Sequence, residues 1–112
     1  MTRSEFSQVF AAALNAGLSA IDALKCIRSK AVTTAIKTAI LNHLYEIVTP
    51  YCLSMIEKDV ENELNEFSMI DGWYDWKVKA VHDSKKRKLI VQVAVKHSMS
   101  MEFTIYSGET DC

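Results

Sequence analysis

Side chains that could do covalent or acid–base chemistry are few in this 112-residue sequence and lie far apart. Nucleophilic catalysis needs a cysteine or serine beside a histidine, and a zinc site needs three or four ligands at recognisable spacings. The cysteines and histidines are Cys26, Cys52, Cys112, His43, His82 and His97. Their spacing fits neither arrangement, and the sequence motifs of hydrolases, phosphate-binding loops and dinucleotide sites are absent. The sequence therefore predicts no enzyme activity, no metal site and no cofactor.

The densest charge run consists of four consecutive basic residues, Lys85, Lys86, Arg87 and Lys88. The run separates two apolar segments and is therefore expected in the loop of a β-hairpin, where solvated cations are common and discourage edge pairing. Adjacent cations can also bind phosphates in a salt-dependent manner, or form a nuclear-import signal. Aromatic residues do not alternate with these cations, so the stacking platform of single-strand-binding proteins is missing. The three interpretations remain open.

A second candidate contact with nucleic acid lies in the segment FAAALNAGLSAIDALKCI, residues 10–27, which resembles a helix-turn-helix. In this resemblance Gly17 makes the turn and the second helix reads the DNA. The cations available there are Lys25, Arg28 and Lys30, of which Lys25 is the strong donor and the others would hold the backbone. A plain αα-hairpin that packs into the core explains the same pattern.

Residues 6–27 are also locally similar to the helical cytoplasmic domains of type II secretion and type IV pilus platform proteins, in which an AGL turn precedes an amphipathic helix. The similarity covers about a fifth of this chain. Those proteins continue with more helices and then membrane spans, whereas this sequence continues with strands. The resemblance therefore assigns no functional role to any residue here.

An acidic segment, IEKDVENELNEF, is expected to form an amphipathic helix with carboxylate-rich exposed faces. Residues 51–73 contain one basic and six acidic side chains, whereas residues 1–50 and 74–112 each have a net charge of +2. The carboxylates expected to contact a basic partner are Asp59, Glu61, Glu63 and Glu66, with Asp71 as a further candidate. Such a partner would relieve the repulsion between them, as for inhibitors that imitate nucleic acid. The alternative is a solvated helix face without a partner.

Three large apolar side chains, Trp73, Ile90 and Tyr106, are expected on the solvent-facing side of the sheet, because they fall out of phase with the buried positions. If these side chains converge, they form an apolar patch of the kind that binds a partner or a second copy of the chain. This patch is the best-motivated functional site that the sequence offers.

Four helices are expected to precede the sheet. Thr2 can cap the first helix and Gly17 can end it, Ser19 can cap the second, and Thr49 followed by Pro50 restarts the chain as a fourth. The expected spans are about 3–16, 19–29, 33–47 and 50–67. The third helix is expected to bury Ile36, Ala39, Ile40, Leu44 and Ile47.

After Asp71 and Gly72 the apolar period changes from about 3.6 to 2, which predicts an antiparallel three-stranded meander. The helices must cover one of its faces. The side chains expected on the covered face are Tyr74, Trp76, Val78, Ala80, Leu89, Val91, Val93, Val95, Met101, Phe103 and Ile105.

The sequence thus predicts a single α+β domain over residues 1–112, with a helical part at about 3–67 packed on one face of a β-meander at about 73–106. Hydrophobic residues make up 49% and charged residues 24%, as in globular domains, and the net charge of −1 excludes binding to nucleic acid or membranes by overall charge. The odd cysteine count and the polar start, MTRSEF, favour the cytosol, and no apolar run is long enough to span a membrane.

The expected function is a small, non-enzymatic, cytosolic protein-binding module of the inhibitor, immunity or adaptor type. It would act through the outer sheet face or the acidic helix, and a homodimer is possible. The alternative is a nucleic-acid-binding regulator that uses the αα-hairpin and the basic loop. Its contact residues would be Lys25, Arg28, Lys30, Lys85, Lys86, Arg87 and Lys88.

Overall fold

The computed structural model describes residues 2–43, 47–97 and 102–111. Within these residues the chain forms three helices followed by an antiparallel sheet of three strands in the order β1-β2-β3. The elements are α1 (Arg3–Asn15), α2 (Ala20–Asn42), α3 (Pro50–Asp71), β1 (Trp73–Asp83), β2 (Lys88–His97) and β3 (Thr104–Asp111). The α+β class is confirmed, whereas the expected fourth helix is wrong.

The helices begin where the sequence signals place them. Thr2, Ser19 and Thr49 are the N-caps, and each side-chain hydroxyl accepts a hydrogen bond from the backbone amide three residues later, at 3.1–3.2 Å. Pro50 occupies the first helical position of α3, where its missing amide costs nothing. Gly72 ends α3 in the left-handed conformation, with φ 70°. These local hydrogen bonds explain why the helix starts are predictable from sequence.

The helices expected at about 19–29 and 33–47 are one continuous helix, α2. The segment between Ser29 and Thr33 contains neither glycine nor proline, so a weaker apolar stripe there does not interrupt the backbone hydrogen bonds. Buried Ile27, Val32 and Ile36 keep the stripe in contact with the core across the expected break. Ile47, expected to be buried at the end of this stripe, lies outside the helix and is 85% exposed; Leu44 is outside the described residues.

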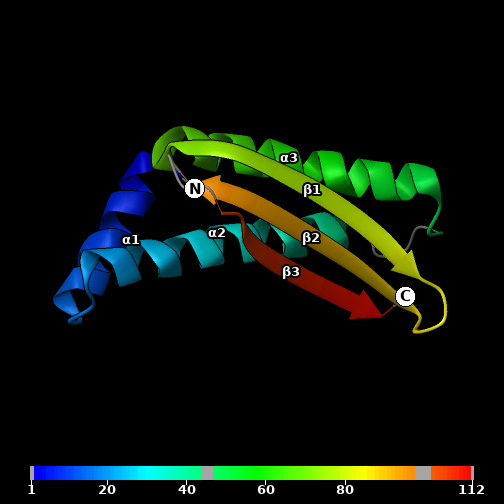
Figure 1. The fold of residues 1–112 in the computed structure, drawn as a ribbon, viewed down its shortest axis with the longest axis horizontal. Coiled ribbons are helices and arrows are strands. Elements are labelled where there is room, and N and C mark those ends of the chain that lie inside the picture. Colours follow the sequence, from blue (N-terminus) through cyan, green and yellow to red (C-terminus); the bar gives the residue numbers. More distant parts are fainter. Residues whose placement is uncertain (1, 44–46, 98–101, 112) are drawn as a thin grey trace.

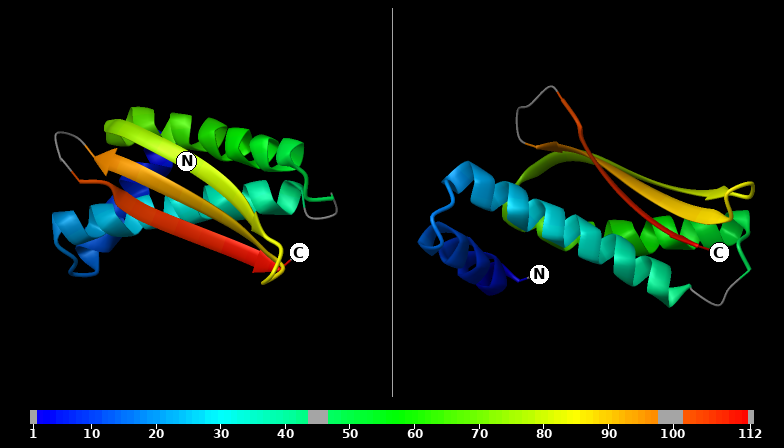
Figure 2. Two further views of the ribbon diagram at one scale, coloured as in Figure 1. Left: turned by 45° about the vertical axis from the view of Figure 1, so that its right-hand side comes forward. Right: turned by 90° about the horizontal axis from the view of Figure 1, so that it is seen from below.

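The sheet lies on one side of α2 and α3, and α1 packs across one end of these helices (Figures 1 and 2). The covered face of β2 is the one predicted, because Leu89, Val91, Val93 and Val95 are all buried. Phe67 of α3 is central to the aromatic part of the core and contacts the rings of Phe6 and Trp73. None of the helices in the described part of the chain has the length and apolarity that a membrane span requires.

A β-bulge at the start of β1 changes the side to which Trp73 points. Trp73 lies opposite His97 and Asp75 lies opposite Lys96, so β1 has one extra residue at this point. The extra residue places Trp73 and Trp76 on the same side of the sheet, where their rings meet edge to face at 6.0 Å. Trp73 is therefore 7% exposed and part of the core, contrary to the expectation from strict alternation. The side chain of Tyr74 is outside the described part of the structure.

The alternation in β3 is also opposite to the expectation. Phe103 and Ile105 are 41% and 60% exposed, whereas Tyr106 lies opposite buried Val93 and packs against the core. Gly108 explains this phase, because a Cβ built on it would lie 2.6 Å from Cγ2 of Ile36. β3 can approach α2 this closely only on the face that carries the glycine. Met101, expected to be buried with Phe103, lies outside the described residues.

Candidate interaction surfaces

The face of the sheet that points away from α2 and α3 is called here the outer sheet face, and Figure 1 looks onto it. Strand register defines its members, because residues opposite one another point to the same side. In β2, Ile90 lies between Val81 and Glu109, and Ala94 lies between Lys77 and Ile105. The outer sheet face comprises Asp75, Lys77, Lys79, Val81, Asp83, Lys88, Ile90, Gln92, Ala94, Lys96, Ile105, Ser107, Glu109 and Asp111, with Phe103 at its end.

This surface combines exposed apolar side chains with lysines. Val81, Phe103 and Ile105 are 40–60% exposed. The ammonium groups of Lys77 and Lys96 lie 6.0 and 5.7 Å from the centroid of the Phe103 ring. Such cation–π contacts hold the ring in place without removing it from solvent. The outer sheet face therefore offers apolar contact area beside lysines, with carboxylates toward its ends.

The apolar patch expected from Trp73, Ile90 and Tyr106 does not form, because these residues lie on different faces. Trp73 is in the core and donates its indole N–H to Asp71. Tyr106 faces the helices, and burial raises the pKa of its phenol above the ordinary value of 10. Ile90 is half-buried on the outer sheet face. The apolar members that sequence reasoning missed are Phe103 and Ile105, and Gly108 is the signal that would have reversed the assigned phase of β3.

The expected carboxylates of α3 are divided between several roles. Asp59 lies 2.8 Å from Nε2 of His43 and links the end of α2 to α3. Glu63 lines a trough, whereas Glu61 and Glu66 are exposed to solvent. Positions 59, 63 and 66 follow helical spacing on one side of α3, and position 61 lies off that side. The acidic segment is therefore not one continuous surface.

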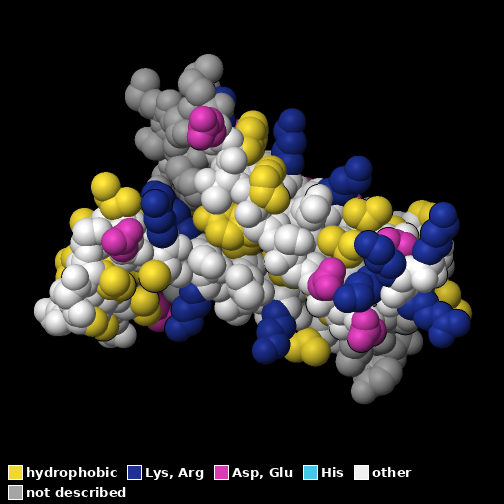
Figure 3. All heavy atoms as spheres, turned by 60° about the horizontal axis from the view of Figure 1, so that its bottom comes forward, with side chains coloured by type: hydrophobic (Ala, Val, Ile, Leu, Met, Phe, Trp, Pro, Cys, Tyr) yellow, Lys and Arg dark blue, Asp and Glu magenta, His cyan; other side chains and the backbone are white. Residues whose placement is uncertain are grey.

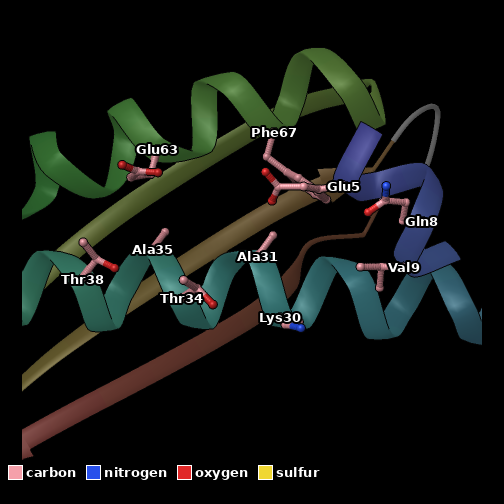
Figure 4. Close-up of a pocket in the computed structure, with 10 residues that line it drawn as sticks. All are labelled: Glu5, Gln8, Val9, Lys30, Ala31, Thr34, Ala35, Thr38, Glu63 and Phe67. Carbon is pink, nitrogen blue, oxygen red and sulfur yellow. The ribbon is translucent and has the colours of Figure 1, made fainter. Parts of the chain in front are cut away.

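The trough lies between α1, α2 and α3 and has a volume of about 290 Å³. Figure 4 shows Glu63 projecting from α3 and Glu5 projecting from α1, with Thr34 and Thr38 on α2. Small Ala31 and other short side chains of α2 leave this space open. The trough has both polar and apolar walls, and within the described ranges no group of three histidines, cysteines, aspartates or glutamates gathers to hold a metal ion.

The basic loop occupies the tip of the β1–β2 hairpin, as expected. Oδ1 of Asp83 accepts hydrogen bonds from the amides of Lys85 and Lys86, and Arg87 takes a left-handed conformation with φ 51°. Lys88 begins β2 and donates to Glu109 at 2.9 Å, which raises the pKa of the lysine. Lys85, Lys86 and Arg87 are exposed cations of a hairpin loop, and Lys88 belongs to the sheet.

The cations of the helix-turn-helix-like segment do not join the basic loop. Arg28 forms a two-pronged ion pair with Asp71, with nitrogen–oxygen distances of 2.6 and 3.1 Å, and its side chain is 20% exposed. Lys25 and Lys30 are exposed on the first half of α2. That half of α2 lies at the opposite end of the molecule from the hairpin tip (Figure 1). Arg28 therefore has a structural role, and the two basic regions cannot form one surface.

No model of a known protein family matches this chain. A comparison with curated proteins likewise finds no match. Function must therefore be inferred from the geometry and chemistry of the surfaces described above.

Proposed function

We propose that this protein is a small, non-enzymatic protein-binding module that binds its partner through the outer sheet face. The observation that carries this proposal is the exposure of Phe103, Ile105 and Val81 on a face that the helices leave open. Exposed apolar side chains bordered by polar groups are typical of protein interaction sites. Phe103 and Ile105 form one such group, and Val81 beside Ile90 forms a second one nearer the hairpin tip. The sheet provides a rigid support, which limits the conformational entropy lost on binding.

The chemistry of the surface indicates what the partner offers. Lys77 and Lys79 follow each other on one side of β1, about 6.8 Å apart along the strand, and Lys96 lies beside the same Phe103 ring as Lys77. A matching surface would place an apolar side chain on Phe103 and Ile105 and carboxylates near the lysines. Complementary charge of this kind accelerates association and selects the partner.

A protein partner is better supported than nucleic acid. Phe103 could stack with one base, but Val81 and Ile105 are aliphatic and do not extend it into a row of stacking platforms, and Lys88 is paired with Glu109. Asp75 and Glu109 interrupt the positive charge along the outer strands. Because Arg28 is bound to Asp71, the helix-turn-helix interpretation also loses one of its phosphate contacts. Exposed Cys26 is a free thiol, which fits the reducing cytoplasm as the proposed location.

Reversing two charges on the outer sheet face tests the proposal. Immobilised protein is expected to retain a protein from a lysate of the source organism, and the double variant Lys77→Glu, Lys79→Glu is expected to bind it about tenfold more weakly or worse. The matched control is Lys25→Glu, Lys30→Glu, which reverses two exposed lysines on α2. Circular dichroism verifies that both variants fold, and biolayer interferometry measures the affinities.

Two outcomes would contradict the proposal. Equal retention by the Lys77→Glu, Lys79→Glu variant would exclude the outer sheet face as the binding surface. Salt-sensitive retention of DNA or RNA that disappears in the triple variant Lys85→Glu, Lys86→Glu, Arg87→Glu would instead support the nucleic-acid alternative.

A further inference from the structure

The outermost strands of the sheet, β1 and β3, differ in how their outward backbone groups are satisfied. α3 packs along β1, and the amide of Ala80 donates a hydrogen bond of 2.9 Å to Oε1 of Glu57 on that helix. A carboxylate from α3 thus takes the place that a neighbouring strand would occupy. β1 is therefore protected against pairing with another strand.

The outward backbone groups of β3 have no such protection. Among the hydrogen bonds between described residues, the backbone of β3 is bonded to β2 alone. Pairing with β2 runs from Thr104 to Asp111 without a register shift, and this strand, TIYSGETD, contains neither lysine nor proline and carries its two charged side chains, Glu109 and Asp111, near its end. Bulges, lysines and prolines are the usual devices that keep edge strands apart. β3 therefore presents a regular row of unpaired amides and carbonyls.

A groove runs beside this edge, between β3 and α2, with a volume of about 350 Å³. Its apolar wall comes from Ile36, Ile40 and Leu41 of α2, and Leu41 is 57% exposed. Figure 3 turns this flank of the molecule forward and shows apolar side chains among the charged ones. A strand added to β3 would continue the sheet over α2, and its inward side chains would enter the groove. The flank therefore has backbone and apolar complementarity for one further strand.

We propose that this strand is β3 of a second copy of the chain, paired antiparallel about a two-fold axis through Ser107. Opposite residues in a sheet must point to the same side, which restricts the registers that two identical strands can adopt. The register centred on Ser107 pairs residues 104–110 of both copies and keeps inward residues opposite inward residues. It forms about six to eight interchain hydrogen bonds, two for each directly bonded pair.

The side chains of β3 are self-complementary in this register. Tyr106 lies opposite the partner's Gly108 on the inner side, so two large side chains do not face each other there. Thr104 lies opposite the partner's Thr110, and β-branched side chains pair well across strands. Glu109 lies opposite the partner's Ile105, and its charge is already balanced by Lys88 of its own chain. Like charges therefore do not face each other across the new interface.

The two-fold axis is perpendicular to the sheet, so both outer sheet faces lie on the same side of the dimer. The dimer interface is the edge of β3 with the groove beside α2, and it shares Ile105, Ser107 and Glu109 with the outer sheet face. The inference does not rest on the proposed function, and the Lys77→Glu, Lys79→Glu variant separates the two, because its changes lie on β1 and not on β3.

Ser107 lies on the two-fold axis, so its side chain lies opposite the partner's Ser107. A charge introduced at this position therefore tests the dimer directly. Wild-type protein is expected to sediment as a dimer whose fraction falls on dilution. Ser107→Lys and Ser107→Glu each place like charges opposite one another and are expected to raise the dissociation constant about tenfold or more. An equimolar mixture of the two variants is expected to recover the dimer, because opposite charges then meet. Ser107→Thr, which keeps a small hydroxyl, is the control and should dimerise as the wild type does.

Amide hydrogen exchange provides a second measurement that does not depend on variants. In the monomer, every second amide of β3 is protected by β2 and the others exchange quickly. The fast-exchanging amides between Thr104 and Thr110 are expected to become protected as the concentration rises. A protein that remains monomeric up to about 1 mM, or a dimer that Ser107→Lys and Ser107→Glu leave unchanged, would overturn the proposal.

Discussion

Replacing Asp71 with alanine is expected to lower the free energy of unfolding by about 3–5 kcal/mol, the range for breaking a buried ion pair. The Asp71 carboxylate is 4% exposed and accepts hydrogen bonds from both Nε and one terminal nitrogen of Arg28. It also accepts the indole N–H of Trp73. The variant leaves a mostly buried guanidinium without its counter-charge and a buried indole N–H without its acceptor. Urea denaturation followed by circular dichroism measures the loss.

The exposed ion pair of the sheet is the matched control. Lys88 and Glu109 are 36% and 53% exposed, and Glu109→Ala is expected to cost less than about 1 kcal/mol. A double variant that replaces the buried pair by apolar residues, Arg28→Met with Asp71→Leu, should recover most of the stability, because both charges are then removed. If Asp71→Ala cost no more than Glu109→Ala, the buried pair would not have the structural role assigned to it.

The variant Gly108→Ala is expected to lower the free energy of unfolding by about 1–3 kcal/mol, as overpacked core positions do. The added Cβ would lie 2.6 Å from Cγ2 of Ile36, which is 3% exposed on α2 and has few ways to move aside. In most strands the same change would be neutral or favourable, because alanine restricts the unfolded chain more than glycine does. A loss of stability on Gly108→Ala, rather than a gain, would therefore report the close contact between β3 and α2.

A second substitution can relieve this clash. Ile36→Leu removes the branch at Cβ that the new methyl group would meet and keeps the side-chain volume, so it should cost less than about 1.5 kcal/mol alone. In that background Gly108→Ala is expected to be nearly neutral, and a double-mutant cycle from denaturation curves measures the coupling. Ser107→Ala, at the exposed neighbouring position, is the control. Additive losses in the cycle would show that Gly108 does not contact Ile36 as described.

The contact of Gly108 with Ile36 also connects the fold to the proposed interactions. It directs Tyr106 toward the core and leaves Ile105 on the outer sheet face. The same glycine lies opposite the partner's Tyr106 in the proposed dimer. A substitution of Gly108 is therefore expected to lower the free energy of unfolding of the single chain and, through the displaced β3, to weaken the proposed dimer.

Features that depend on neighbours a few residues away were predictable from sequence. The caps at Thr2, Ser19 and Thr49 each act over three residues, and the start of α3 at Pro50 follows from one missing amide. The alternation of β2 was equally clear, because a strand between two others buries one complete row of side chains.

The errors came from patterns with more than one physical solution. A weakened stripe after Ser29 suggested a helix end, but the helix continues because its backbone hydrogen bonds need no apolar side chain at every turn. Alternation in β3 showed two faces without showing which one the helices cover. The lesson from both cases is that a pattern of polarity limits the choices, and a stop signal or a steric contact decides between them.

By itself, the sequence determined the α+β class, the order of helices before strands, the helix starts and the hairpin tip at Lys85–Arg87, because short-range hydrogen bonds and strand periodicity govern them. Tertiary structure alone decided that Trp73 is buried, that Phe103 and Ile105 face solvent, and that Arg28 pairs with Asp71. These outcomes depend on contacts between residues far apart in the chain, and the free energy of such contacts is set by which surfaces finally pack together.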